Sequence, residues 1–214
     1  MTDKPDVTDK TAEEPKKLRQ IAMIGTAPST RGDAPFKDTA WEIWGQADYW
    51  KDMSHISRWY EFAPIEKLKG AFSPEYIEFP KDAKFPVYMR KHYDDFPTSV
   101  PFPFEDMAKQ FGREFMSATL VWMICQAVTE HINGDEIGII GLWGYDLAID
   151  SEYVSQRPGL RHMEWICREY LPAIGKPPIT VAIPRGSDLA ISPIPYPFAE
   201  DDIMVAKIRR RAGS

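Results

Sequence analysis

The first residues that could do chemistry form a polar loop near the start of the chain. Its functional groups come from Gly25, Thr26, Ser29, Thr30 and Arg31. A glycine after a buried strand lets the backbone turn tightly and approach a ligand. Hydroxyl groups, backbone N–H groups and a guanidinium together suit a phosphate or another anion. The loop matches neither GxGxxG nor GxxxxGK[ST], so an ordinary strand-to-loop turn is the alternative.

A second polar loop follows the most apolar stretch, residues 136–141. Its members are Trp143, Gly144, Tyr145 and Asp146. Asp146 could accept hydrogen bonds from ribose or sugar hydroxyl groups, and Trp143 or Tyr145 could stack on a ligand ring. The alternative is a loop in which the acid only caps the next turn. We expect Asp146 to be catalytic or to bind the sugar, and its neighbours to bind substrate.

A third group lies further along the chain. Arg157 precedes Pro158, which favours a helix start, and an arginine beside the positive end of a helix attracts anions. Glu152 lies upstream, and we expect it to bind substrate together with Arg157. The alternatives are a solvent-exposed arginine or a salt bridge from Arg157 to Glu152 or Asp150. His162, one turn into that helix, is the candidate general base, against the alternative of an ordinary surface histidine. The four histidines are scattered without metal-ligand spacing, so we expect no metal site.

Alternating strands and helices must position these loops. Apolar runs predict strands over residues 19–25, 41–45, 85–89, 136–141 and 179–183, and helices over 52–69, 113–131 and 159–171. This order predicts an α/β fold, with a Rossmann-like, mainly parallel sheet and helices on both faces, in a single domain over residues 19–214. Because ligands bind at the carboxyl edge of such sheets, the glycine-containing loops should meet there.

Several segments outside this pattern carry their own expectations. Residues 1–18 are charged and lack aromatics, which predicts a disordered tail. Prolines over 94–106 predict a long ordered loop that could act as a lid. A short helix is expected near 200–210. The tryptophan pattern places Trp41 and Trp44 in the core, and Trp50 and Trp59 along a pocket.

Charge and cysteine content narrow the functional classes. The 214 residues carry a formal net charge of −6, which argues against general binding of a nucleic-acid backbone. The basic run at 207–211 weighs mildly for DNA. Cys125 and Cys167 lie in apolar stretches and should be reduced core thiols. The chain shows no apolar run long enough for a membrane helix and no signal peptide, so a cytoplasmic protein is expected.

Two regions resemble small proteins of bacteriophages and prophages: Ile21–Arg31 with Trp41–Gly45, and residues 143–148 with Glu152, Tyr153 and 156–158. More distantly, Gly-x-x-Pro-Ser after the first strand and Gly-x-Asp after a late strand are similar to the Rossmann-like half of bacterial sialyltransferases and related glycosyltransferase-like proteins. In that family the first loop holds the nucleotide of a sugar nucleotide. Ala27 and Thr26 replace a glycine and an asparagine that are usual there, so the resemblance supports nucleotide binding better than sugar transfer.

The expected function is that of a nucleotide-sugar-binding, glycosyltransferase-like enzyme without a cofactor. It would be phage-encoded, work in the host cytoplasm and act on a modified nucleic-acid base or a small acceptor. The first loop would hold phosphate or nucleoside, Asp146 would hold the sugar hydroxyls or orient the acceptor, and Arg157 would neutralise the pyrophosphate. Two alternatives stay open: a non-catalytic protein that sequesters a nucleotide, and a hydrolase of a nucleotide's N-glycosidic bond that uses Glu152 or Asp150.

Overall fold

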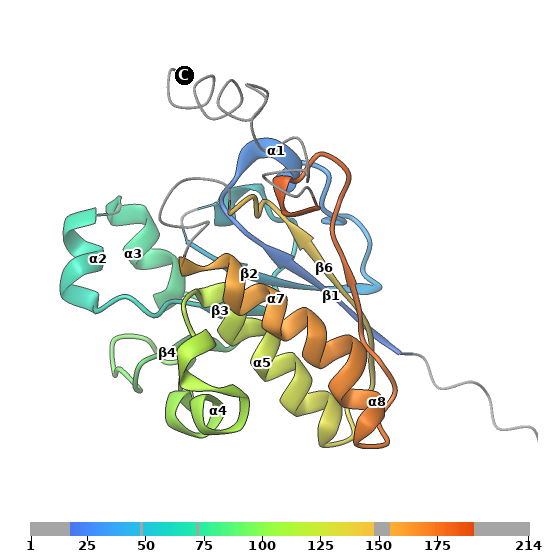
Figure 1. The fold of residues 1–214 in the computed structure, drawn as a ribbon. Helices are drawn as coiled ribbons and strands as arrows, with labels where there is room; N and C mark the ends of the chain where they lie inside the picture. The colour runs from blue at the N-terminus through green and yellow to red at the C-terminus, as the bar shows by residue number, and fades with distance from the viewer. Residues whose placement is uncertain (1–17, 48, 72, 148–154, 191–214) are drawn as a thin grey trace, which may run out of the picture.

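One all-parallel sheet organises the chain (Figure 1). The computed structural model describes residues 18–47, 49–71, 73–147 and 155–190. Within them the sheet has seven strands, in the spatial order β5 (Ser99–Pro101), β4 (Val87–Met89), β3 (Arg58–Tyr60), β2 (Trp41–Gln46), β1 (Arg19–Ile24), β6 (Ile137–Trp143) and β7 (Thr180–Ala182). The predicted α/β fold with a parallel sheet is confirmed.

The strand order reverses between β1 and β6. The chain winds outward from β1 to β5, and then returns to place β6 on the other side of β1. Ile24 pairs with Trp143, so the two strands end at the same level. In open parallel sheets the loops at such a reversal leave a ligand-binding position beyond the carboxyl ends of the strands. The loops at Gly25 and Gly144 follow these two strands.

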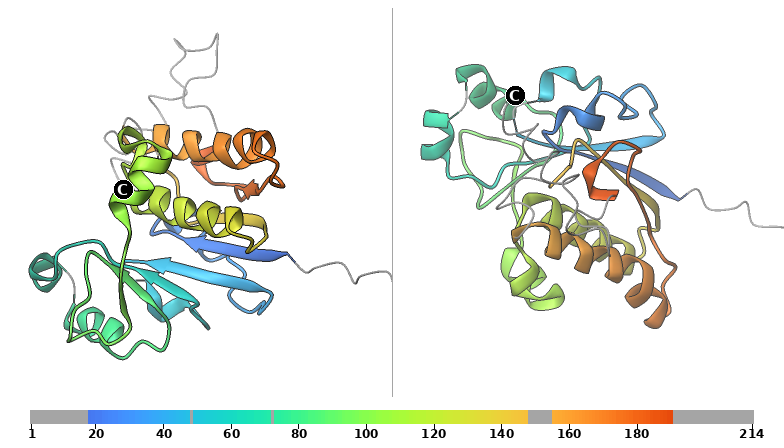
Figure 2. Two further views of the ribbon diagram at one scale, coloured as in Figure 1. Left: turned by 90° about the horizontal axis from the view of Figure 1, so that it is seen from below. Right: turned by 45° about the horizontal axis from the view of Figure 1, so that its top comes forward.

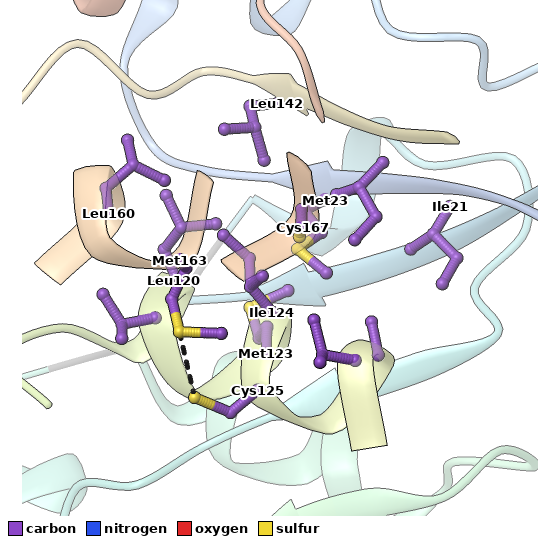
Figure 3. Packing of buried hydrophobic residues seen from close by; sticks show 14 of the residues in the cluster. Ile21, Met23, Leu120, Met123, Ile124, Cys125, Leu142, Leu160, Met163 and Cys167 are labelled. Atoms are coloured by element: carbon purple, nitrogen blue, oxygen red, sulfur yellow. Dashed lines mark hydrogen bonds between the residues drawn. The ribbon is translucent and has the colours of Figure 1, made fainter. Parts of the chain in front are cut away.

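Long helices cover one face of the sheet. They are α5 (Thr119–Ile132) and α7 (Arg157–Trp165), which continues through a π-helical turn, η3 (Ile166–Tyr170), into α8 (Leu171–Ala173). At the edge lie α4 (Phe104–Phe111) and a short 3-10 turn, η2 (Arg113–Phe115) (Figures 1 and 2). Figure 3 shows the core between these helices and the sheet, where β1, β6, α5 and α7 each contribute apolar side chains.

Both cysteines lie in this core. Cys125 and Cys167 are free thiols without solvent exposure, as predicted. The Cys125 thiol lies 3.6 Å from Met163 Sδ (Figure 3). Burial raises the pKa of both thiols, that of Cys167 to about 12, so neither forms a reactive thiolate at neutral pH.

Shorter elements cover the opposite face. They are α2 (Ile65–Ala71) and α3 (Pro74–Lys81) (Figure 2). Residues of both helices pack with Trp59 and Val87 in one cluster. Loop residues such as Phe36 cover the β1 and β2 side chains that point the same way. The remaining elements are α1 (Pro28–Arg31) and two 3-10 turns, η1 (Trp50–Asp52) and η4 (Asp188–Ala190). The expected covering of both faces is therefore present.

The predicted helix over 52–69 is wrong. Its residues form part of η1, then strand β3, then the first part of α2. Trp59 and Tyr60 are both fully buried, but they belong to clusters on opposite faces of the sheet, which is the alternation of a strand. Trp59 is therefore a core residue and does not line a pocket. Trp44 is buried in the core as predicted.

Two other boundaries also differ from the prediction. The segment 94–106 is not a loop throughout, because it contains β5 and the first turn of α4. Its prolines fit there because β5 is an edge strand, which tolerates proline, and Pro103 precedes the helix. Helix α5 begins at Thr119, and residues 113–115 form the separate turn η2. The tail up to residue 17, the helix near 200–210 and the basic run 207–211 lie outside the described residues.

Among the described residues, no helix is long and apolar enough to cross a membrane.

An ion-pair network ties the amino-terminal edge of the sheet to α5. Arg19 donates to Glu42 at 2.6 and 2.9 Å and to Glu130 at 2.9 Å, and Arg58 also pairs with Glu130. Each of these side chains is at most 30% exposed. Burial favours the neutral form of Glu42, but hydrogen bonds from Arg19 and Trp44 outweigh it and lower the pKa of that carboxyl. The network therefore holds the first residues of β1, β2 and β3 in register with the end of α5.

Replacing Glu42 with Gln is expected to lower the free energy of unfolding at neutral pH by about 1–3 kcal/mol, because Arg19 loses a charged partner. The folded pKa of Glu42 lies below its ordinary value of 4.5, so its contribution is present above that value and is lost as the pH falls through the folded pKa. The gap between wild type and Glu42→Gln in urea unfolding should therefore shrink on acidification below about pH 4.5.

Glu75→Gln is the matched control. Glu75 pairs with Lys51 at the surface, where water and salt screen the pair, and no measurable change is expected. An equal loss of stability in both variants would contradict the role given to Glu42.

Candidate functional site

The loops that follow β1 and β6 lie against each other at the carboxyl edge of the sheet. Gly25 N donates to Trp143 O at 2.8 Å, and Ala27 N donates to Gly144 O at 2.8 Å. The buried Thr30 hydroxyl of α1 accepts a hydrogen bond from Gly144 N at 2.9 Å. The two glycine-containing loops therefore meet at one rim, although more than a hundred residues separate them in sequence.

Two glycines make this contact possible. A Cβ atom at Gly25 would lie 2.3 Å from Gly144 O, which is backbone and cannot rotate away. Gly144 has a φ of +72°, and its Cβ would lie 2.7 Å from Gly25 O. The left-handed backbone at Gly144 is strained for any residue with a side chain. Both glycines therefore act by allowing two backbones to touch.

This contact brings Ser29 and Asp146 together. The exposed Ser29 hydroxyl donates to Asp146 Oδ1 at 2.8 Å, and the backbone N–H of Asp188 donates to the same oxygen at 3.3 Å. No described residue hydrogen-bonds to Asp146 Oδ2. The carboxylate is only partly exposed, and the two hydrogen bonds to its first oxygen fix its orientation.

Arg31 lies beside the same loop. Its guanidinium stacks on the Tyr49 ring, with Cζ 3.6 Å from the ring centre, and Nη1 donates to Thr26 O at 2.7 Å. Such a cation–π contact fixes the position of the guanidinium over the ring, and the guanidinium keeps its positive charge. Tyr49 and Thr26 O therefore orient the Arg31 guanidinium beside the exposed residue Thr26.

The sequence suggested that Trp143 or Tyr145 could stack on a ligand ring. In the structure both side chains contact other side chains of the protein. Trp143 meets Trp41 edge to face, at 5.3 Å between ring centres, on the sheet face away from α5. Tyr145 is 5% exposed, and its hydroxyl accepts a hydrogen bond from Gln46 Nε2 at 2.9 Å. Burial raises the pKa of Tyr145, so this phenol stays neutral. Tyr145 is therefore a buried ring, whereas Trp143 is partly exposed, and a stacking role for Trp143 stays a prediction.

Arg157, which the sequence suggested for anion binding, is buried. It is 7% exposed, and its Nη2 donates to Asp188 O at 3.1 Å and to Leu189 O at 2.8 Å. The Ser187 hydroxyl in turn donates to Tyr145 O at 2.6 Å. Arg157 thus holds the segment that presents the Asp188 N–H to Asp146, and it acts on the rim through that segment.

His162 packs against η2 and the last residue of α4. Its ring stacks on Phe115 at 3.8 Å, and Nε2 lies 2.9 Å from Phe111 O. A carbonyl oxygen can only accept, so Nε2 donates the hydrogen bond and Nδ1 is the ring nitrogen with acceptor character. No contact between described residues joins this ring to Ser29 or Asp146, and its role as a general base stays a prediction. Glu152 and Asp150 lie outside the described residues.

The sequence did not point to Glu61, which directly follows β3 at the carboxyl edge of the sheet. It is 6% exposed, and it accepts hydrogen bonds from the Tyr76 hydroxyl at 2.5 Å and from Ala63 N at 2.9 Å. Burial raises the pKa of Glu61 against the effect of these hydrogen bonds. Because this segment was predicted as a helix, there was no reason in the sequence to place Glu61 and Phe62 after a strand, at the carboxyl edge of the sheet.

One arrangement of Ser99, His92 and Asp94 has the composition of a catalytic triad but not its accessibility. Ser99 Oγ lies 3.0 Å from His92 Nδ1, yet Ser99 is 6% exposed and its hydroxyl also bonds to both the N–H and the carbonyl of Tyr93. The Asp94 carboxylate is fully exposed, 3.8 Å from the ring. A nucleophile must be open to substrate, and the Ser99 hydroxyl is not. Its contacts with His92 and Tyr93 instead stabilise a turn.

Within the described residues, no group of three or more histidine, cysteine or acidic side chains could hold a metal ion. Comparisons with protein-family models, curated proteins and solved structures gave no match.

Gly144→Ala is expected to lower the free energy of unfolding by about 2–4 kcal/mol, because it adds left-handed strain and a clash with Gly25 O. Gly32→Ala is the control, since no atom lies within 4 Å of its added Cβ and its φ is −64°. It should leave stability unchanged or raise it by up to about 1 kcal/mol. Chemical denaturation measures both, and equal stability of the two variants would show that the loops do not touch.

Arg157→Ala is expected to destabilise the fold by about 1.5–3 kcal/mol, because Asp188 O and the buried Leu189 O lose a charged donor, although Arg161 still donates to Leu189 O. Arg168→Ala is a suitable control, because Arg168 is exposed and pairs with its exposed neighbour Glu169. A thermal melt compares them. An unchanged melting temperature for Arg157→Ala would argue against the structural role.

Proposed function

We propose that the chain binds a nucleotide or nucleotide-sugar at the rim formed by the loops after β1 and β6, and transfers the sugar to an acceptor. The observation that carries this proposal is the Ser29–Asp146 hydrogen bond at the point where the strand order reverses. It orients a partly exposed carboxylate at the position where parallel sheets commonly bind nucleotides.

The groups at the rim suit the parts of such a ligand. Asp146 Oδ2 can accept a hydrogen bond from a ribose or sugar hydroxyl, and the charge of a carboxylate strengthens such a bond. Arg31 and the Thr26 hydroxyl suit the phosphates, since the guanidinium is already oriented by Tyr49. The phosphates can approach the loop closely, because Gly25 has no side chain at the turn.

Sugar transfer also needs a group that takes the proton of the acceptor hydroxyl. Asp146 is the predicted catalytic residue that lies at the rim, and we assign it that role. The placement of His162 against Phe111 and Phe115 favours the second candidate function, nucleotide binding without chemistry. Hydrolysis of an N-glycosidic bond would require Glu152 or Asp150.

A thermal-shift screen of nucleotides and sugar nucleotides tests the proposal. A ligand present at 100 times its dissociation constant adds about 2.7 kcal/mol to the stability of the folded state. For the best ligand, Asp146→Asn should weaken binding in calorimetry by about 1.5–3 kcal/mol, because the amide keeps the shape but loses the charge. Asp82→Asn, at an exposed carboxyl after α3, is the control and should bind normally.

The fate of the bound sugar nucleotide separates the two candidate functions. If the wild type releases or transfers the sugar, and Asp146→Asn slows this by about 10²–10⁴-fold, the chain is an enzyme. If the donor stays intact in the presence of acceptors, binding alone is the function. Equal affinity of Asp146→Asn and wild type would remove Asp146 from the site.

A further inference from the structure

A separate hollow lies at the same edge of the sheet, above β3, β4 and β5. Its volume is about 320 Å³. Four separate segments line it: Phe62 follows β3, Arg90 follows β4, Phe104 begins α4, and Trp122 lies in the first turns of α5. In the sheet order, β2 stands between this hollow and the strands that carry the Ser29–Asp146 pair.

Aromatic rings form the walls of the hollow. Phe62 and Phe104 lie 4.8 Å apart between ring centres, and Phe104 and Trp122 lie 5.0 Å apart, in an edge-to-face arrangement. All three rings are only partly buried, although they pack against the main core. They therefore offer exposed aromatic surface in a concave site, where a planar ring can stack and displace water.

A positive charge stands beside these rings. The Nε of Arg90 donates to Phe62 O at 2.7 Å, which orients the guanidinium. Neither Nη1 nor Nη2 of Arg90 bonds to any described residue, and no described carboxylate pairs with this arginine. The two Nη groups form the planar fork that binds phosphate or carboxylate in a bidentate manner.

The loop before α5 adds to this positive character. Thr119 and Ala118 line the hollow, and Ala118 precedes the helix without supplying a side-chain acceptor to its first N–H groups. The positive end of a fourteen-residue helix therefore faces the same space as Arg90. Aromatic walls and positive charge occur together on one side of the molecule.

We infer that this hollow binds a planar aromatic ring that carries a phosphate, the chemistry of a nucleoside monophosphate, as a ligand separate from the one at the Ser29–Asp146 rim. The ring would stack among Phe62, Phe104 and Trp122, and the phosphate would bind Arg90. The volume lies at the lower end of the range of small-molecule sites, about 300–1,000 Å³, and so fits one mononucleotide. The net charge of −6 disfavours a longer nucleic acid.

Calorimetry with nucleoside monophosphates, the matching nucleosides, inorganic phosphate and a short single-stranded oligonucleotide tests the inference. The monophosphate should bind at least about tenfold more tightly than the nucleoside, because only the monophosphate reaches Arg90. Quenching of tryptophan fluorescence should accompany binding and should be largely lost in Trp122→Phe, which keeps an aromatic wall. Tighter binding of the oligonucleotide than of any mononucleotide would overturn the assignment in favour of a single-strand site.

Arg90→Gln should weaken monophosphate binding by about ten- to hundredfold and leave nucleoside binding unchanged. Lys91→Gln is the control, because Lys91 is the next residue, is exposed, and lies over Tyr93 and not in the hollow. The inference is overturned if Arg90→Gln binds the monophosphate like wild type. It is also overturned if Asp146→Asn abolishes the Trp122 signal, because the ligand would then occupy the rim alone. Thermal melts confirm that each variant is folded.

Discussion

The rim depends on one close approach between two backbones, at Gly25 and Gly144. A side chain at either position would meet a carbonyl oxygen at a distance that folded proteins do not tolerate. The approach is also hydrogen-bonded, through Gly25 N, Ala27 N and the Thr30 hydroxyl. The loop after β1 and the loop after β6 are thus joined into one surface by backbone contacts and by the Thr30 hydroxyl.

The orientation of the Asp146 carboxylate depends on the contact between the two loops and on the segment around Asp188. Ser29 reaches the carboxylate from α1, and the N–H of Asp188 reaches it from the segment after β7. Arg157 holds that segment from α7 through two backbone carbonyl groups. Three elements that are distant in sequence therefore fix one oxygen of a carboxylate, and this is the kind of support that a precise polar contact needs.

Apolar runs that end in glycine were enough to predict the main strands, the parallel sheet and the meeting of Ser29 with Asp146. The long apolar face of α5 was equally clear. These features depend on local periodicity and on the general rule for the carboxyl edge of a sheet. Strand β3 was missed because three residues are too few to show alternation, and the aromatic residues around it also fit one side of a helix.

The roles of individual side chains at the rim were harder to predict. Arg157 has the sequence context of an anion site, but its partners are the carbonyl groups of residues 188 and 189, about thirty positions away. The same applies to Tyr145, whose ring direction depends on packing against Gln46 and Met123. Long-range contacts decide whether a polar residue supports a site or faces its ligand, and no local pattern encodes them.

The two outer strands of the sheet, β5 and β7, have a consequence for how copies of this chain behave in solution. An open sheet exposes unpaired N–H and C=O groups at each border, and these can recruit a strand from another molecule. Here β5 ends at Pro101, while Pro178 and Pro184 stand close to either end of β7. Proline lacks the N–H that such recruitment requires, and both strands span only three residues. Short, proline-flanked border strands thus disfavour edge-to-edge association of the sheet.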